Sequence, residues 1–231
     1  MAISFTAAAN NCTIATVTSI TCTLPVAVAA GDIVLVVANC GATTAPTSVT
    51  ITDGSGDTYT DSALGSFVGG GTFNTGRFRV GAFLTPTVGT TTFTATMSPA
   101  NGNFAEIYAW KVSGIVGTPT LDKAVQANGT GTTADSGSSG TLTAAAEAAV
   151  GYVTVANAVT GAGSGWSTGG TNINDGIQTT SSDIGEHRIT AATTAIDATC
   201  AISSGGDWLA ILLTVFDAGN TFANNAVMVM M

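Results

Sequence analysis

The segment Ser48-Val-Thr-Ile-Thr-Asp-Gly-Ser-Gly-Asp57 alternates apolar and hydroxyl side chains and then enters a run of acidic residues and glycines. Alternation with a period of two is typical of a strand with one buried face, and Asp and Gly are typical of turns. The same pattern returns in Thr91-Thr-Phe-Thr-Ala-Thr-Met97. No helical periodicity extends beyond two turns, although the Ala-rich run 144–150 favours one short helical turn. The sequence therefore predicts an all-β chain.

The other strand candidates are bounded mostly by Gly, Pro, Asn or Asp. With the two above, the candidates cover residues 3–7, 13–23, 32–39, 48–52, 58–62, 77–84, 91–97, 104–112, 149–157, 187–191, 195–202 and 207–216. Many short strands without a helix favour a two-sheet antiparallel β-sandwich of jelly-roll type. Long loops rich in Gly, Ser and Thr are predicted at 65–76, 128–140 and 161–183. No change in composition marks a second domain, so we expect residues 1–219 to form one.

The composition excludes several classes of function. Charged residues make up 8% of the 231 residues, against roughly 25% in an average soluble protein. Five Lys and Arg, in a chain of net charge -9, cannot form the basic surface that nucleic acids require. The longest apolar runs, 33–38 and 208–216, have the length of strands, whereas a membrane-spanning helix needs about 20 apolar residues. We therefore expect neither a nucleic-acid partner nor a membrane partner, and a surface of hydroxyls and backbone suited to close packing.

The two ends of the chain carry different expectations. Residues Met1 to Thr6 have no basic or apolar signal region. Either the sequence is a mature form that starts by chance at Met, or the chain is made in a host cytoplasm and used without a signal peptide, and the second interpretation is simpler. Residues 220–231 extend beyond the last predicted strand, and they end in six apolar residues. These are Ala226, Val227, Met228, Val229, Met230 and Met231. An apolar tail needs cover, and the polar spacer before it favours β-augmentation on a neighbouring subunit over docking on its own sheet.

The four cysteines, Cys12, Cys22, Cys40 and Cys200, are scattered, and the only histidine is His187. That spacing makes a zinc site improbable. Two interpretations stay open, buried thiols and disulfides. If disulfides form, Cys12–Cys22 across a hairpin with Cys40–Cys200 is one of three pairings that the sequence allows.

Asp53, Asp57 and Asp61 form a weak calcium candidate, because carboxylate oxygens are the ligands of that ion. The favoured interpretation is a turn in which Asp53 and Asp57 bind backbone groups and Gly54 and Gly56 adopt positive φ. No other pattern predicts a cofactor or a resident metal.

A catalytic role is the weakest hypothesis. Gly165-Trp-Ser-Thr-Gly169 matches the G-x-S-x-G pattern, but Gly- and Ser-rich sequence flanks it where a nucleophile elbow needs a strand and a helix. Ser167 and His187 are therefore predicted to be loop and strand-end residues, and the chain is predicted not to be an enzyme. Trp166, in the same loop, is a candidate for stacking on a sugar ring, for a subunit interface, or for pinning the loop to its own domain.

Several segments between residues 24 and 217 together resemble a jelly-roll or Ig-like β-domain that is widespread in bacteriophage virion proteins and in some bacterial surface proteins. The matching segments are Leu24-Pro25 with 29–37, 49–60, 92–96, 105–114 with Asp122, and 209–216. Each piece is similar to a strand or turn signature of that family, and none is a catalytic motif. The chain lacks the fibre, coiled-coil and catalytic modules that often flank such domains.

The resemblance implies a position in a particle more than a reaction. It implies a non-enzymatic virion protein on the particle surface, such as a capsid decoration or cement protein, a head fibre or a minor tail protein. The implied partners are the major capsid or tail protein and further copies of the chain, with trimers common among similar proteins. Two alternatives stay open: a carbohydrate-binding or adhesin domain that uses Trp166, and an extracellular filament subunit polymerised by the C-terminal tail.

Overall fold

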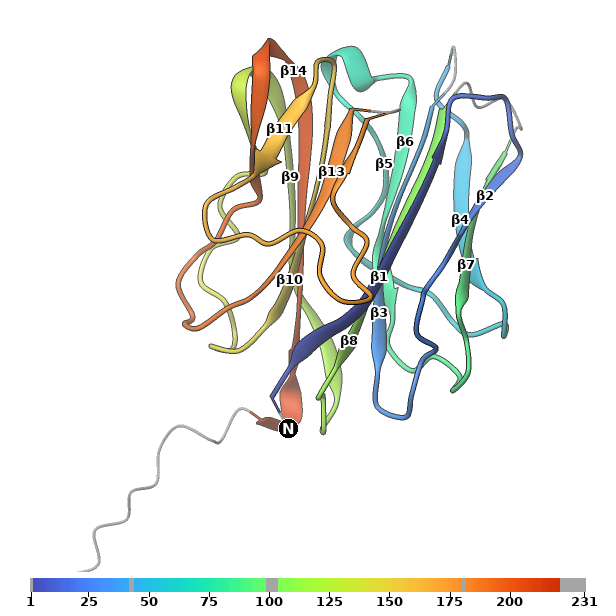
Figure 1. Ribbon diagram of the computed structural model, residues 1–231, viewed down its shortest axis with the longest axis vertical. Coiled ribbons are helices and arrows are strands. Elements are labelled where there is room, and N and C mark those ends of the chain that lie inside the picture. Colours follow the sequence, from blue (N-terminus) through green and yellow to red (C-terminus); the bar gives the residue numbers. More distant parts are fainter. Residues whose placement is uncertain (1, 42–43, 99–103, 180–181, 221–231) are drawn as a thin grey trace, which may run out of the picture.

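The computed structural model describes residues 2–41, 44–98, 104–179 and 182–220, and nearly all of its regular elements are strands (Figure 1). In chain order these are β1 (Ser4–Thr13), β2 (Ser19–Thr23), β3 (Ile33–Gly41), β4 (Ser48–Asp53), β5 (Thr60–Val68), β6 (Gly76–Phe83), β7 (Thr92–Ser98), β8 (Phe104–Ser113), β9 (Pro119–Asp135), β10 (Ala148–Val155), β11 (Val159–Ala162), β12 (Ile177–Gln178), β13 (Asp183–Ile189) and β14 (Thr199–Asp217). Within the described chain the helical elements are two 3-10 turns, η1 (Gly71–Phe73) and η2 (Ala218–Asn220). The predicted all-β sandwich is confirmed, whereas the run 144–150 holds bends and the start of β10 in place of a helical turn.

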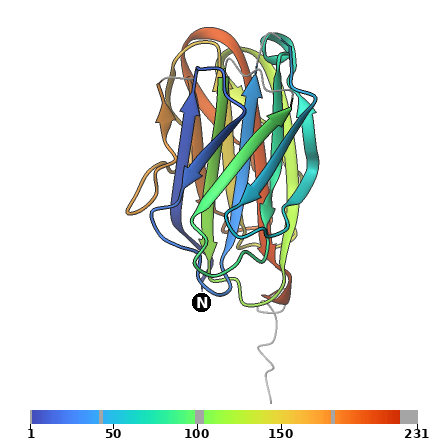
Figure 2. The same ribbon diagram turned by 90° about the vertical axis from the view of Figure 1, so that its right-hand side faces the viewer.

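The strands form three stacked antiparallel sheets, where the sequence predicted two. We call them the central sheet (β1-β8-β3-β6-β5), the threonine sheet (β2-β7-β4) and the C-terminal sheet (β11-β14-β10-β13-β12, with β9 also paired to β14). Figure 1 shows the central sheet as the middle layer, and Figure 2 looks onto the threonine sheet, whose strands cross in front of it. The extra layer arises because the second half of the chain folds a sheet of its own.

The inner strands of the central sheet, β3 and β8, are buried on both faces, which explains the unbroken apolar run in β3. All nine residues of this strand are buried. Leu35 and Val37 enter the core shared with the C-terminal sheet, whereas Val34 and Val36 enter the core shared with the threonine sheet. A strand covered on both sides has no polar face, so its sequence loses the period of two.

The first eight strands pair in a nested order. β1 pairs with β8, β2 with β7, and β3 with β6, all antiparallel. The chain therefore folds back on itself at the connection between β4 and β5. β4 belongs to the threonine sheet, whereas β5 belongs to the central sheet. This arrangement brings residues about 100 positions apart, such as Ala8 and Trp110, into register.

The predicted loop 128–140 is wrong over its first part, because β9 runs to Asp135 along the edge of β14. The glycines in this segment favoured a loop over a strand in the sequence analysis. Gly129 lies opposite Trp208, and a Cβ at Gly129 would stand 2.6 Å from the indole ring. The indole thus fills the space that a side chain on β9 would take, so this glycine serves the packing of the strand.

Other boundaries also differ from the prediction. β5 runs to Val68, inside the predicted loop 65–76, and β13 begins at Asp183, inside the predicted loop 161–183. The candidates 195–202 and 207–216 belong largely to one strand, β14, whose pairing with β9 shifts between Ala201 and Gly206. The candidate 13–23 is divided, since β1 ends at Thr13 and β2 begins at Ser19. The apolar tail, Ala226 to Met231, lies outside the described residues.

Candidate functional site

The acidic turn after β4 uses its carboxylates as ligands for the backbone. Asp53 Oδ1 accepts hydrogen bonds from the amides of Ser55 (3.2 Å) and Asp57 (2.9 Å), and Asp57 accepts one from the Thr87 hydroxyl (2.8 Å). Gly56 has a φ of 81°, as predicted. The prediction of a positive φ at Gly54 is wrong. The Thr87 bonds lower the pKa of Asp57, and burial raises the pKa of Asp53. The turn interpretation therefore accounts for two of the three calcium candidates.

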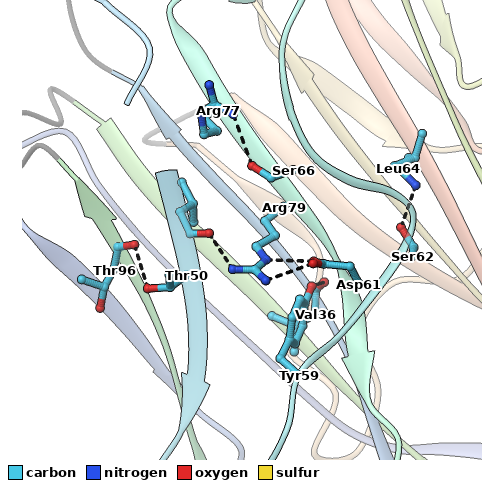
Figure 3. Close-up of polar contacts among 11 residues, drawn as sticks. Val36, Thr50, Tyr59, Asp61, Ser62, Leu64, Ser66, Arg77, Arg79 and Thr96 are labelled. Carbon is cyan, nitrogen blue, oxygen red and sulfur yellow. Dashed lines mark hydrogen bonds and ion pairs between the residues drawn. The ribbon is translucent and has the colours of Figure 1, made fainter. Parts of the chain in front are cut away.

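The third candidate, Asp61, is held by Arg79 of β6, as Figure 3 shows. The guanidinium binds both carboxylate oxygens, at 2.8 and 3.0 Å, and donates a third bond to the carbonyl of Val49 on β4 (2.8 Å). It also lies 5.1 Å from the centre of the Tyr59 ring, whose hydroxyl donates to Val36 O (3.2 Å). Arg79 thus joins the edge of the central sheet to the edge of the threonine sheet. Among the described residues no cluster of three acids, histidines or cysteines is arranged to hold a metal ion.

We expect Arg79→Met to lower the free energy of unfolding by about 2 kcal/mol, because it removes a bidentate ion pair and a bond to a carbonyl. Arg79→Lys keeps the positive charge but loses the two parallel N–H donors of the guanidinium, so the free energy of unfolding should fall by about half as much. Urea unfolding followed by circular dichroism measures both. Equal stability of Arg79→Met and the parent chain would contradict the assigned role.

The structure contains free cysteines, and their positions explain why the suggested disulfides do not form. Cys12 points toward the C-terminal sheet, where its thiol donates to Gln178 Oε1 (3.5 Å), whereas Cys22 lies in the core on the other face of the central sheet. Cys40 shares that second core, and Cys200 lies in a core on the far side of the C-terminal sheet. Burial raises the pKa of Cys22, Cys40 and Cys200 to about 12, so these thiols stay protonated.

Trp166 pins its loop to its own domain, which is the third of the interpretations left open above. The residue is 8% exposed, and its indole N–H donates to the carbonyl of Asp197 (2.9 Å). The guanidinium of Arg188 lies 5.5 Å from the centre of the ring. The indole therefore offers no free face for a sugar ring.

The structure does bring the Ser167 and His187 candidates together, with an aspartate that the sequence argument missed. The two backbones exchange both hydrogen bonds at 2.9 Å, and His187 Nδ1 lies 2.6 Å from Asp175 Oδ2. Such a pair projects its side chains on one face of the ladder. Among the described contacts, however, none joins the Ser167 hydroxyl to the imidazole of His187. The centre of the Phe5 ring lies 4.9 Å from the centre of that imidazole. The nucleophile–base contact that activates a serine is absent from this set, and no helix follows Ser167.

Asp175 is the anchor of this region. It is fully buried, and it also accepts hydrogen bonds from the indole N–H of Trp110 (2.9 Å) and from the amide of Gly169 (2.7 Å). Donors from β8, from β13 and from the loop between β11 and β12 therefore converge on the Asp175 carboxylate. The arrangement docks the loop onto two sheets.

A second group of buried acids lies between the central and C-terminal sheets. Glu106 accepts a hydrogen bond from the Tyr152 hydroxyl (2.6 Å), which in turn accepts one from Asn39 Nδ2 (3.1 Å). Asp183 accepts one from the Tyr108 hydroxyl (3.0 Å). Burial raises the pKa of Glu106 well above its usual range, and the neighbouring Asp183 raises it further. Burial therefore favours the protonated form of Glu106, and these side chains form a structural network with no exposed member.

One acid of this network, Glu106, carries a signal in the sequence. Glu106 stands inside the otherwise apolar strand 105–110, in phase with Tyr108 and Trp110, so period two alone places the carboxyl in the core. Asp175 and Asp183 carried no such signal, because they lie in or beside a loop whose path depends on tertiary contacts.

The cationic side chains all have partners within the chain. Arg79 binds Asp61, Lys111 binds Asp32, and Lys123 binds Asp122. Arg77 donates to Pro46 O and Ser66, and Arg188 packs on Trp166. The absence of a free basic surface follows directly, because these five are all the Lys and Arg in the sequence.

The outer face of the threonine sheet is built from hydroxyl side chains. Its members alternate with the inward-facing apolar residues of the three strands, and they are Ser19, Thr21, Thr23, Ser48, Thr50, Thr52, Thr92, Thr94, Thr96 and Ser98. Register places Thr94 between Thr21 and Thr52, and the hydroxyls of Thr21 and Thr94 are 2.7 Å apart. The Thr50 hydroxyl donates to Thr96 O (3.4 Å) (Figure 3). We call this surface the hydroxyl face, and it carries no charge.

Comparison with known proteins yields no match to a family, to a curated protein or to a solved structure. Within the described residues, no helix is long and apolar enough to cross a bilayer. Functional inference therefore depends on this chain's own geometry.

Proposed function

We propose that this protein is a non-enzymatic structural subunit of a virus particle, a capsid decoration or minor virion protein that stabilises the particle through contacts between subunits. The observation that carries the proposal is the hydroxyl face, a charge-free surface on three paired strands. Threonine loses little side-chain entropy on docking, because its χ1 is already restricted. A face without charges also avoids the cost of desolvating an ion.

The nested pairing of β1 to β8 supports the jelly-roll part of the proposal. A jelly roll is a long antiparallel ribbon wound into two sheets, and the pairs β1–β8, β2–β7 and β3–β6 have that order. β5 departs from it, because it pairs with β6 in the central sheet. On this proposal the partners are the major capsid or tail protein and further copies of the chain.

The assembly part of the proposal is tested by light scattering of the purified chain. We expect a defined oligomer, and a trimer is the form that the resemblance to virion β-domains implies. Thr94→Lys places an ammonium group in the middle of the hydroxyl face, so it should give a smaller particle. Thr133→Lys, exposed on β9, is the matched control and should keep the parent mass. A monomer at every concentration would contradict self-assembly, and an unchanged mass for Thr94→Lys would remove the hydroxyl face from the interface.

Two further measurements separate the alternatives. A chain ending at Gly219 tests the predicted apolar arm, since loss of the oligomer with an unchanged circular dichroism spectrum assigns assembly to the tail. Mass spectrometry of virus particles purified from the host that carries the gene tests virion membership. Fibres formed by the pure protein, with no chain found in particles, would favour the filament subunit. The buried Trp166 leaves the carbohydrate-binding alternative without its proposed stacking residue.

A further inference from the structure

A groove of about 350 Å³ lies between β5, at the edge of the central sheet, and the first residues of β9, at the edge of the C-terminal sheet. Its apolar lining consists mainly of Leu84, Leu121, Ala124 and the buried Leu213. The first three are only partly buried, and they pack against the core that the two sheets share. That core therefore keeps exposed apolar surface along this side of the molecule.

Both strands that border the groove have an unpaired outer edge. Among the described residues, β9 pairs with β14 alone and β5 with β6 alone. β5 leaves its ladder between Asp61 and Ser66, whereas β9 pairs with β14 residue for residue from Ala124 to Gly131. This stretch of β9 contains neither a charge nor a proline, which are the residues that commonly protect an edge. The backbone of β9 is therefore able to accept one more strand.

The edges of the other strands are covered by groups of the same chain. The loop between β11 and β12 exchanges backbone hydrogen bonds with Ala8 of β1. Asn11 Nδ2 donates to Thr21 O of β2 (2.8 Å), and Arg79 donates to Val49 O of β4 (2.8 Å). These contacts occupy backbone groups that an added strand would need, so the side of β9 is the favoured place for strand addition.

The charged side chains that line the groove are paired with opposite charges. Asp61 binds Arg79 (2.8 Å), as Figure 3 shows, and Lys123 binds Asp122 (3.1 Å). A further ion in the groove would lose water and find no free opposite charge, which is costly. The groove therefore suits an uncharged, apolar strand.

The apolar arm of this chain, Ala226 to Met231, has that character, and residues 220–225 before it are also uncharged. The described chain ends beside the groove, because the Ala218 amide donates to Thr118 O, next to Pro119 of the groove lining. An arm that turned back here would run parallel to β9, since β14 and β9 are antiparallel. An arm from a second copy is able to enter from the opposite end and run antiparallel, which is the slightly more stable pairing.

We propose that the apolar arm of one copy adds as a strand to the outer edge of β9 in a second copy and places its side chains in this groove. The inference rests on the proposed function, for which it names the contact between subunits. Each copy has one arm and one groove, so contacts of this kind close into a ring, and a trimer is one such ring.

Disulfide trapping in the full chain tests the contact. Ala63→Cys places a thiol at an exposed position of the groove lining, and Val229→Cys places one in the arm. After oxidation, a mixture of the two variants should contain covalent pairs with one chain of each kind. Their yield should be at least about tenfold above that of either variant alone, because two cysteines are bridged only when their Cα atoms lie within about 7 Å. Thr50→Cys, exposed on the hydroxyl face, replaces Ala63→Cys in the matched control and should stay at the background yield.

A charge in the arm provides a second measurement that leaves the described fold unchanged in sequence. Val229→Glu should raise the concentration of half-assembly in light scattering by at least about tenfold, because the arm would carry an ion into an apolar groove. Asn224→Glu adds the same charge before the arm, so it is the matched control and should assemble as the parent chain does.

Each result bears on the proposal. Covalent pairs in the mixture, together with weaker assembly of Val229→Glu, support it. A chain with both cysteines that closes the disulfide within itself overturns the assignment to a second copy, because the arm then occupies its own groove. An oligomer that forms without the crosslink overturns the groove contact and leaves the proposed structural function standing. A parent chain that stays monomeric at every concentration overturns this contact and the proposed self-assembly together.

Discussion

Raising the pH from 5 to 9 is expected to lower the apparent melting temperature of this protein by about 10 °C. The reason is the buried acids. Burial raises the pKa of Glu186 from 4.5 to about 8, and burial is also the largest cause of the raised pKa of Glu106 and Glu147. Between the unfolded and folded pKa values, the folded chain holds protons that the unfolded chain has released. Stability therefore falls as the pH rises through this window.

The expected size follows from Glu186. A shift from 4.5 to about 8 is worth on the order of 4 kcal/mol between these pH values, and Glu106 acts in the same direction. Below pH 4 the sign reverses, because hydrogen bonds lower the pKa of Asp217 and Asp122, and their stabilising contribution is lost as they take up protons. The pH of maximum stability should therefore lie near 4–5.

Thermal unfolding at a series of pH values measures this dependence. Glu186→Gln retains an acceptor for the Gly163 amide and cannot ionise, so its stability should fall much less than the parent's between pH 5 and 9. Asp135→Asn, at an exposed position on β9, is the control and should follow the parent chain. A Glu186→Gln profile as steep as the parent's would contradict the assignment of the effect to this carboxyl.

Asp175→Ala is expected to destabilise the fold by about 4 kcal/mol. The substitution leaves the N–H groups of Trp110, His187 and Gly169 buried without an acceptor. Each such donor costs about 1–3 kcal/mol. Asp175→Asn should destabilise the fold less than Asp175→Ala, because the amide keeps one acceptor oxygen. It should still destabilise the fold, because its NH2 group would face other donors.

Urea unfolding gives the difference in the free energy of unfolding, with Asp197→Ala, at an exposed acid, as the control. The control should stay within about 0.5 kcal/mol of the parent chain. A loss below 1 kcal/mol for Asp175→Ala would show that the converging donors find other partners, and that the loop is not held by this carboxylate.

Most of the central sheet and of the threonine sheet could be predicted from the sequence, because their strands obey simple rules. β4 and β7 alternate with a period of two, and β3 is a short apolar run bounded by Gly31 and Gly41. β9 could not be predicted in this way. Its residues are half-buried or exposed except Ala134, so the strand exists because β14 offers it a long partner.

The candidate residues show the same division. The turn role of Asp53 depends on residues within four positions, and local sequence predicted it correctly. Whether Cys12, Cys22 and Cys200 can pair depends on the face of the sheet on which each side chain lies. The spacing of cysteines along the chain does not predict that face. The function proposed here remains a prediction, because it rests on a surface and a resemblance.

The sequence by itself determined the all-β class, the lack of a basic surface, the turn chemistry and most strand positions, since these follow from composition and from contacts between near neighbours. Only the tertiary structure decided the third layer, the convergence of Trp110, Asp175 and His187, and the hydrogen bond between Asn39 and Tyr152. These features join residues 12 to 113 positions apart. Their energy comes from burying polar groups against specific partners, and the chain supplies those partners only after the sheets have stacked.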